Sequence, residues 1–358
     1  MKRRTEWGSF LMAAVSALLL TGCYHAKEPE PIPSDADLVI CTDLEPAVYE
    51  PVVKEFEERT GLSVEVLAGT SREVKQRFSD AQNQAGPTAQ GNGEGNASKA
   101  DAQEEWDLAF GVSAELLDEY HALWLPYESS QSEELDARYS SAEHSWTGFS
   151  VLPLVIMYNT NVVTYREVPV GWESLLEPRW QGRVAFADPE QSDVSATALA
   201  AALLACPERQ DYLEVLAENL NGMMPDSVEQ VNEGILDGRD SVGVTTEAAA
   251  QTLRSSGADI DYIYPEDGTL LVVDGTALRA GNSHPDAAKA FLEFTVSRDT
   301  QKILLSSQNR RPVRLDITVE RDMDSLEKLP LLEADGNTCL EKKREALKVW
   351  EKLSGGVS

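Results

Sequence analysis

Short apolar runs that end in small polar turns, each followed by an amphipathic segment, recur along this chain. Residues 38–42 (LVICT) form a continuous apolar run of the kind found in buried parallel strands. The segment 51–61 places Val52, Val53 and Phe56 on one helical face and ends at Gly61, and 63–68 is the next apolar run. This order predicts βαβ units and therefore an α/β fold with mostly parallel sheets.

The same order returns in the second half of the chain. Residues 172–180 carry tryptophans and leucines at helical spacing, 183–187 form a short apolar run, and an alanine-rich helix is predicted after Ser192. A further strand is predicted at 241–244, followed by a helix over 247–253. Two blocks of this kind indicate two α/β lobes.

The polar turns at the strand ends are the candidate ligand site. In open α/β sheets the carboxyl ends of strands and the first turns of the following helices hold small ligands and anions. Each hydroxyl there could equally be an ordinary helix cap. The candidates at these turns are Thr42, Asp43, Thr70, Ser71, Arg72, Ser113, Asp188, Ser192, Asp193, Ser195, Thr245, Thr246 and Glu247.

Six segments of the chain resemble, in the same order, those of solute-binding proteins of ATP-driven (ABC) importers. They are FEERTGLSVEVLAGTS, WDLAFGVSAE, VIMYNTNVV, the stretch W-x-S-L-L-x-P-x-W-x-G-R-V-A-F-A-D-P, VGVTTE and EDGTLLVVDGTALRAGNSHPDAAKAFLEF. The resemblance extends from about Leu38 to Val313 and is greatest to ferric-iron, phosphonate and sugar-phosphate binders. It implies a type II periplasmic-binding-protein fold with a hinge and a central cleft, and a permease as partner.

The pattern and the resemblance together predict the domain boundaries. Residues 37–145 plus 268–308 are assigned to the first lobe, and 146–267 plus 309–353 to the second. The polar, glycine-rich and asparagine-rich segment 82–103 is predicted to be a disordered insertion. Pro153 is expected to break the extended crossing between the lobes, and a helix at 341–353 is expected to pack on the second lobe.

The N-terminus has the features of a bacterial lipoprotein. Three basic residues precede an apolar run at 10–20, which is too short to cross a bilayer, and Leu20-Thr21-Gly22-Cys23 matches a lipobox. Residues 1–22 are therefore predicted to be a signal peptide, Cys23 the lipidated residue and 23–36 a tether. The protein is expected outside the cytoplasm on a membrane face, as a monomer.

The net charge restricts the possible partners. It is −30 for the whole chain, and because residues 1–22 carry three basic residues and one acid, removal of this +2 leaves −32. Nucleic acid is thereby excluded as a partner. An anionic ligand would need a locally basic site, which Arg72 and the run containing Arg310, Arg311 and Arg314 could supply. Ion pairs with the many acids are the alternative role for these arginines.

Little in the chain indicates catalysis. Cys41, Cys206 and Cys339 show no zinc-ligand spacing, Cys41 is expected in the core, and the motifs G-x-S-x-G and H-E-x-x-H do not occur. No enzyme activity, metal site or cofactor is therefore predicted, and an exported hydrolase is the distant alternative.

The ligand class follows from the groups at the turns. Neutral hydroxyls, backbone N–H groups and arginines favour a small phosphorylated or phosphonate solute. Ferric iron is the alternative ligand. Thr245 and Thr246, however, stand where the ferric-binding members that the chain resembles carry adjacent tyrosines as iron ligands. Tyr262 and Tyr264 lie nearby, but their i, i+2 spacing is typical of one face of a strand. Carboxylates such as Asp43 would instead suit an amine, a hydroxyl-rich solute or a metal.

Overall fold

The structure, a computed structural model, describes residues 36–85, 105–319 and 323–354. Its strands are β1 (Leu38–Thr42), β2 (Val64–Ala68), β3 (Leu108–Ser113), β4 (Thr147–Asn159), β5 (Val184–Ala185), β6 (Val242–Thr246), β7 (Ile260–Ile263), β8 (Leu271–Leu278) and β9 (Arg311–Pro312). Its α-helices are α1 (Pro46–Thr60), α2 (Ser71–Ala85), α3 (Ala114–Glu119), α4 (Asp193–Ala205), α5 (Tyr212–Leu220), α6 (Val228–Leu236), α7 (Glu247–Ser255), α8 (Pro285–Thr295), α9 (Arg298–Gln308) and α10 (Gly336–Ser354).

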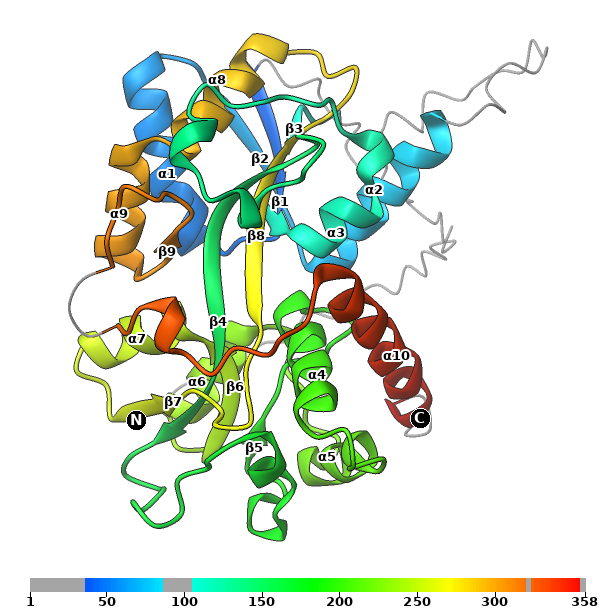
Figure 1. Ribbon diagram of the computed structural model, residues 1–358, viewed down its shortest axis with the longest axis vertical. Coiled ribbons are helices and arrows are strands. Elements are labelled where there is room, and N and C mark those ends of the chain that lie inside the picture. The colour runs from blue at the N-terminus through cyan, green and yellow to red at the C-terminus, as the bar shows by residue number, and fades with distance from the viewer. Residues whose placement is uncertain (1–35, 86–104, 320–322, 355–358) are drawn as a thin grey trace, which may run out of the picture. The chain divides into compact units, whose positions relative to one another are not determined.

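Two long strands, β4 and β8, run through the middle of the structure (Figure 1). The strand order is β2-β1-β3-β8-β4-β6-β5, and β7 and β9 also pair with β4. The first part of β4, up to Pro153, pairs with β8, and from Leu154 onward it pairs with β6 and β7. The pairing partner of β4 thus changes at Pro153 and Leu154, between the two lobes.

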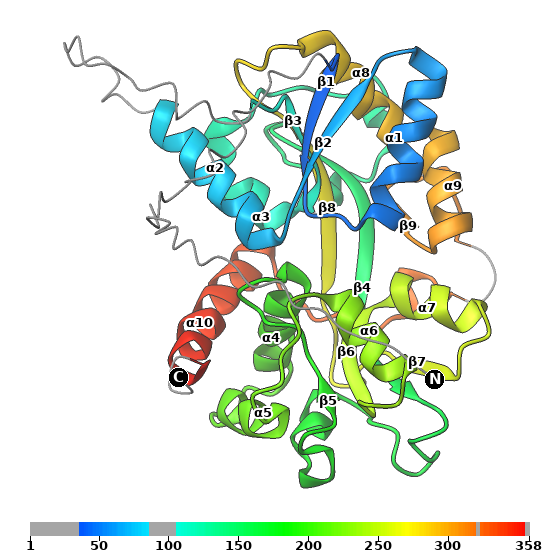
Figure 2. The same cartoon turned by 180° about the vertical axis from the view of Figure 1, so that it is seen from behind.

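The first lobe has helices on both faces of its sheet. Alternate residues of β1 point to opposite faces: Leu38 and Ile40 pack with Phe56 of α1 and Phe291 of α8, whereas Val39 and Cys41 belong to the cluster around α2 and α3. A parallel strand covered on both faces is apolar at every position, as 38–42 are. Figure 2 shows α1, α8 and α9 on one side of β1 and β2, and α2 and α3 on the other.

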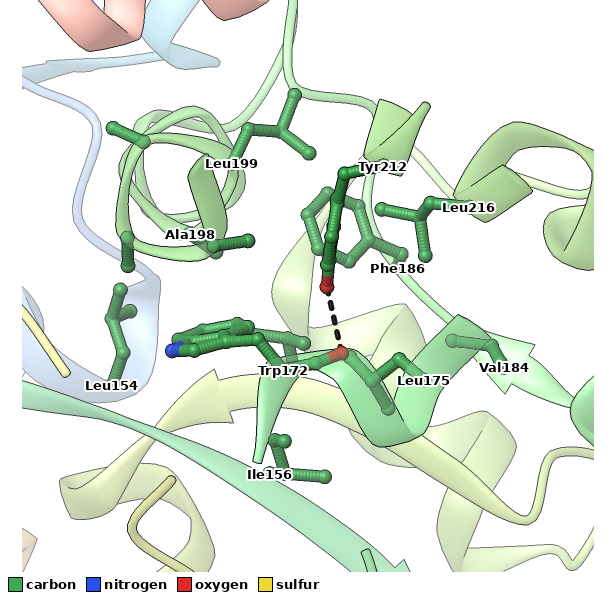
Figure 3. Packing of buried hydrophobic residues seen from close by; sticks show 14 of the residues in the cluster. Leu154, Ile156, Trp172, Leu175, Val184, Phe186, Ala198, Leu199, Tyr212 and Leu216 are labelled. Carbon is green, nitrogen blue, oxygen red and sulfur yellow. Dashed lines mark hydrogen bonds between the residues drawn. The ribbon is translucent and has the colours of Figure 1, made fainter. Parts of the chain in front are cut away.

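The second lobe is built around Trp172. This side chain packs with Leu154 and Ile156 of β4 and with Leu199 of α4, and Tyr212 donates a hydrogen bond to the Trp172 carbonyl at 2.9 Å (Figure 3). The opposite face of β4 packs on α6 and α7.

The C-terminal helix α10 covers α4 and α5, and it lies beside α4 in both overall views (Figures 1 and 2). Ala346 and Trp350 are its buried residues in the second-lobe core, at 0% and 1% exposure. The alanine-rich sequence of α4 permits this close approach, because its small side chains let another helix lie near its backbone.

Several elements differ from the sequence predictions. Residues 172–180 form two 3₁₀ turns, Trp172–Leu176 and Pro178–Trp180, because Pro178 ends the first one. Pro153 does not break β4, which continues to Asn159 because the ladder only changes partner there. Helix α2 continues to Ala85, so the predicted loop begins later than residue 82.

Other predictions fall outside what the structure describes or remain untested. The signal peptide, Cys23 and most of the segment 82–103 lie outside the described residues, and the lobe boundaries stay predictions. Within the described part of the chain, no helix combines the length and apolar character needed to cross a bilayer. The prediction of a two-lobed α/β fold is confirmed.

Candidate functional site

A cleft of about 880 Å³ lies between the two lobes. Its first-lobe wall comes from the residues after β1 and β2 and from the end of α9, and its second-lobe wall from the starts of α4, α6 and α7. The sequence positions these groups because each buried strand ends in a polar turn, which brings the turns to the edge of the sheet where the helices begin.

Eight of the fifteen predicted site residues line this cleft. They are Asp43, Thr70, Ser71, Ser113, Ser192, Asp193, Thr246 and Arg310. Four of their hydroxyls act as helix caps or N-terminal turn partners: Thr70, Ser113, Ser192 and Thr246 each accept a hydrogen bond from a backbone N–H three residues later. These hydroxyls therefore already serve the helices that they begin.

The other seven predicted residues are not among those that line the cleft. Thr42, Ser195 and Thr245 are buried, Asp188 accepts a hydrogen bond from the Glu190 backbone, and Glu247 and Arg311 pair with each other in the interior. Arg72 lines a second pocket of about 540 Å³ between α2, α4 and α10, where it forms a 2.5 Å ion pair with Glu190. As cleft residues these seven predictions are not supported by the geometry.

The arginines that were expected to bind an anion are occupied by carboxylates. Arg311, 1% exposed, donates to both oxygens of Glu247 at 2.6 Å and to the Asp324 carbonyl at 2.7 Å. Arg314 pairs with Asp316 at 2.7 Å. Arg310 reaches the cleft, but its guanidinium is bound by Asp274 and by the Ser150 hydroxyl.

Asp43, directly after β1, lies at one end of the cleft. It accepts a 2.7 Å hydrogen bond from the Ser71 hydroxyl, which in turn accepts one from the Asp193 backbone N–H. Burial raises the pKa of Asp43 to about 7, with Asp193 and Asp274 contributing as like charges and the Ser71 bond opposing the shift. Burial therefore favours the protonated form of this carboxyl.

Asp193 is also bound by a lysine whose position no pattern in the sequence indicates. Lys343 of α10 is 6% exposed and forms an ion pair with Asp193. Although burial disfavours its charge, the carboxylates of Asp193 and Glu115 raise the pKa of Lys343. The ion pair thus joins α10 to the first turn of α4.

A second carboxylate group was also missed. Glu45 precedes α1 in the first lobe and lies beside Glu229 of the second-lobe helix α6. Burial, together with Glu229, raises the pKa of Glu45 to about 8. Glu229, Asn232 and Glu233 line the cleft at i, i+3 and i+4, so the polar face of α6 was the signal that could have found them.

Tyr262 and Tyr264 are not arranged as ferric-iron ligands. Tyr264 donates its hydroxyl to Glu247, and Tyr262 donates to Gln251 at 3.0 Å. Burial, followed by the nearby Glu247, raises the pKa of both phenols, which opposes the phenolate form that Fe(III) needs. Among the described residues, no three His, Cys, Asp or Glu side chains converge in a metal-binding arrangement.

Comparison with known proteins identifies the family. The family model described as "Bacterial extracellular solute-binding protein" matches residues 112–336, well over half of the chain. The chain belongs to this family. The resemblance to solute-binding proteins of ABC importers is thereby confirmed.

Curated relatives of this family member are distant in sequence. The Fe(3+)-binding periplasmic protein of Serratia marcescens is 23% identical over 84% of each chain. Iron uptake protein A2 of Synechocystis is 25% identical over 58% of this chain and 64% of its own. The names of these two relatives refer to binding or uptake of iron by those proteins.

Solved structures show the same fold. The periplasmic binding protein AfuA of Actinobacillus pleuropneumoniae, with exogenous fructose-6-phosphate bound, has a TM-score of 0.76 at 18% identity and covers 90% of this chain and 99% of its own. Iron-bound HitA of Pseudomonas aeruginosa has a TM-score of 0.71 at 17% identity, over 88% and 98%. At such identities the likeness establishes the fold and leaves the ligand open.

Proposed function

We propose that this protein is the lipid-anchored, extracytoplasmic solute-capturing subunit of an ABC importer. The observation that carries the proposal is the cleft itself, which both lobes line while β4 and β8 run from one lobe to the other. A ligand held between two lobes that are joined by a few strands can stabilise their closed arrangement. The closed, loaded protein would then be presented to the permease, its second partner.

The crossing between the lobes has the features of a hinge. At the point where β4 changes partner, the Leu154 N–H donates to the Leu270 carbonyl at 3.1 Å, and the Thr269 hydroxyl donates to the Leu154 carbonyl at 2.8 Å. Small φ/ψ changes at these positions would rotate one lobe against the other.

The proposed lipid anchor rests on the lipobox before Cys23 and places the protein on an external membrane face. Labelled palmitate supplied to producing cells should enter the wild-type chain and not the Cys23→Ser variant. The Cys206→Ser variant, which changes a partly buried thiol, is the matched control and should still be labelled. Equal labelling of wild type and Cys23→Ser would refute the anchor.

An anionic, phosphorylated solute was the ligand favoured by the sequence, with ferric iron as the alternative. Arg310 in the cleft supports an anion, and one related structure contains fructose-6-phosphate. The binding of the other arginines to carboxylates removes most of that support. The phenol hydrogen bonds of Tyr262 and Tyr264 likewise weaken the case for iron.

Solute capture is tested by thermal unfolding against a panel of small solutes, since a ligand that binds only the folded protein raises its Tm. At 100-fold excess over Kd the expected stabilisation is about 2.7 kcal/mol. The solute that raises the Tm should be recovered chemically unchanged after prolonged incubation. Its turnover would favour the exported hydrolase instead, and a Tm that no solute shifts would contradict the binding role.

A further inference from the structure

The first turn of α2 makes a direct contact between the two lobes. Arg72 reaches the second-lobe turn at 188–193, where its Nη2 atom pairs with the Glu190 carboxylate at 2.5 Å and its Nε atom donates to the Glu190 carbonyl at 3.4 Å. The preceding residue, Ser71, accepts a hydrogen bond from the Asp193 backbone N–H at 3.4 Å. Two neighbouring residues of the first lobe therefore bind one turn of the second lobe.

Both sides of this contact are held within their own lobes. In the first lobe, the Thr70 N–H donates to the Glu73 carboxylate at 2.8 Å and the Glu73 N–H donates to the Thr70 hydroxyl at 3.3 Å, which is a capping box. In the second lobe, the N–H groups of Gln191 and Ser192 each donate to the Asp188 carbonyl at 2.9 Å. The contact therefore depends on how the lobes are placed relative to each other.

The same contact separates two cavities. Ser71, Ser192 and Asp193 line both the cleft of about 880 Å³ and the second pocket of about 540 Å³. The second pocket also lies between the lobes, because α2 and α3 line one side of it and α4 and α10 the other. Moving α2 away from the turn at 188–193 would join the two cavities. The contact thus closes one side of the cleft.

The hydrogen bonds of Ser71 and Arg72 are used within the protein, although the sequence predicts both as ligand residues. The Ser71 hydroxyl donates its single hydrogen to Asp43 at 2.7 Å and accepts from the Asp193 N–H. Arg72 is not among the residues that line the cleft, and its guanidinium is bound by Glu190. The geometry therefore favours a role in joining the lobes over direct contact with a solute.

We propose that Ser71 and Arg72 form a latch that stabilises the closed arrangement of the lobes. The inference deepens the proposed function and rests on it, because the latch affects solute capture through closure. A protein whose binding-competent state is more populated binds with a lower apparent Kd, so the latch raises affinity without touching the solute. The ion pair is exposed and therefore increases the closing equilibrium constant by up to about fivefold.

The backbone amide of Asp193 reports on the latch. Asp193 is the first residue of α4, so its N–H has no acceptor inside the helix, and its acceptor within the described chain is Ser71 of the other lobe. The test is hydrogen exchange at single-residue resolution by mass spectrometry on the detergent-solubilised full-length protein. Arg72→Ala leaves the Ser71 acceptor in place, yet it should lower the protection of the Asp193 amide about two- to fivefold.

Lys75→Ala is the matched control. It removes the same charge from the same helix, but Lys75 pairs with Glu119 of its own lobe at 3.1 Å. The Asp193 amide should therefore exchange in Lys75→Ala as it does in the wild type. The amide of Ile40 in the buried strand β1 should keep its protection in both variants, which separates opening of the lobes from unfolding.

Salt provides a second measurement that a local structural role would not move. Because the ion pair is exposed, about 1 M NaCl should lower the protection of the Asp193 amide in the wild type and have little effect in Arg72→Ala. Exchange that neither Arg72→Ala nor salt changes would overturn the latch, and so would an equal change in Lys75→Ala. Since no solute is used, that failure would leave the capture role intact, which the solute panel tests separately.

Discussion

Loss of one partner from the buried ion pair between Arg311 and Glu247 is expected to be strongly destabilising, and Arg311→Met tests this. The two side chains are 2% and 0% exposed, and two 2.6 Å hydrogen bonds join them. Among the described residues, removing the arginine leaves Glu247 as a buried carboxylate with the Tyr264 hydroxyl as its side-chain partner. Breaking one side of such a buried pair costs about 3–5 kcal/mol, a large share of the roughly 5–15 kcal/mol that stabilises a typical folded protein.

The assay is urea unfolding followed by tryptophan fluorescence, with Glu247→Gln and the double variant completing a mutant cycle. Because the double variant contains no buried unpaired charge, it should be more stable than additivity predicts, by about 1–3 kcal/mol. Ligand affinity should be unchanged in Arg311→Met, since Arg311 does not line the cleft. A loss of stability below about 1 kcal/mol with no coupling, or a large loss of affinity, would refute this account of Arg311 and restore its role as an anion ligand.

Two further outcomes follow from burial and charge. Trp350→Ala should lower the free energy of unfolding by about 3–5 kcal/mol, because Trp350 is 1% exposed in the second-lobe core. The control Lys348→Ala, on the exposed side of α10, should change the free energy of unfolding by less than about 0.5 kcal/mol. Burial and the neighbouring Glu229 raise the pKa of Glu45 to about 8. Between about pH 4.5 and 8 the folded protein therefore keeps a proton on Glu45 that the unfolded chain has released. The free energy of unfolding without ligand should for this reason fall as the pH rises through this range. A Tm series should show a shallower decline in Glu45→Gln, and an identical slope would contradict the assignment.

The sequence predicts the scaffold well because the signals for it are local. Apolar runs such as 38–42 are buried on both faces, and the cap at Ser192 begins α4 where the pattern places it. The Pro153 prediction failed for a non-local reason: the ladder passes from β8 to β6 at that point, so a residue without an N–H fits between two partners.

The candidate site could be predicted only in part, because a residue's charge partner is set by the fold. Arg311 and Glu247 are 64 positions apart, and no spacing rule indicates that they pair. Lys343 is likewise brought to Asp193 by the packing of a C-terminal helix. The turn residues were found because they follow strands, whereas Glu229 lies within a helix whose cleft-facing side becomes evident only when the lobes are placed together.

The positions of Glu45 and Glu229 link protonation to closure of the lobes. Glu45 and Glu229 belong to different lobes. When the lobes bring them together without a ligand, either one of the two carboxyl groups carries a proton or the two negative charges repel each other. The exposed pair of Arg72 and Glu190, which also joins the lobes, contributes about 0–1 kcal/mol and cannot offset a strong repulsion. A ligand shifts the equilibrium only by its differential affinity for the two states. A proton on Glu45 has the same kind of effect, because it removes the repulsion from Glu229 only where the two lobes bring these residues together.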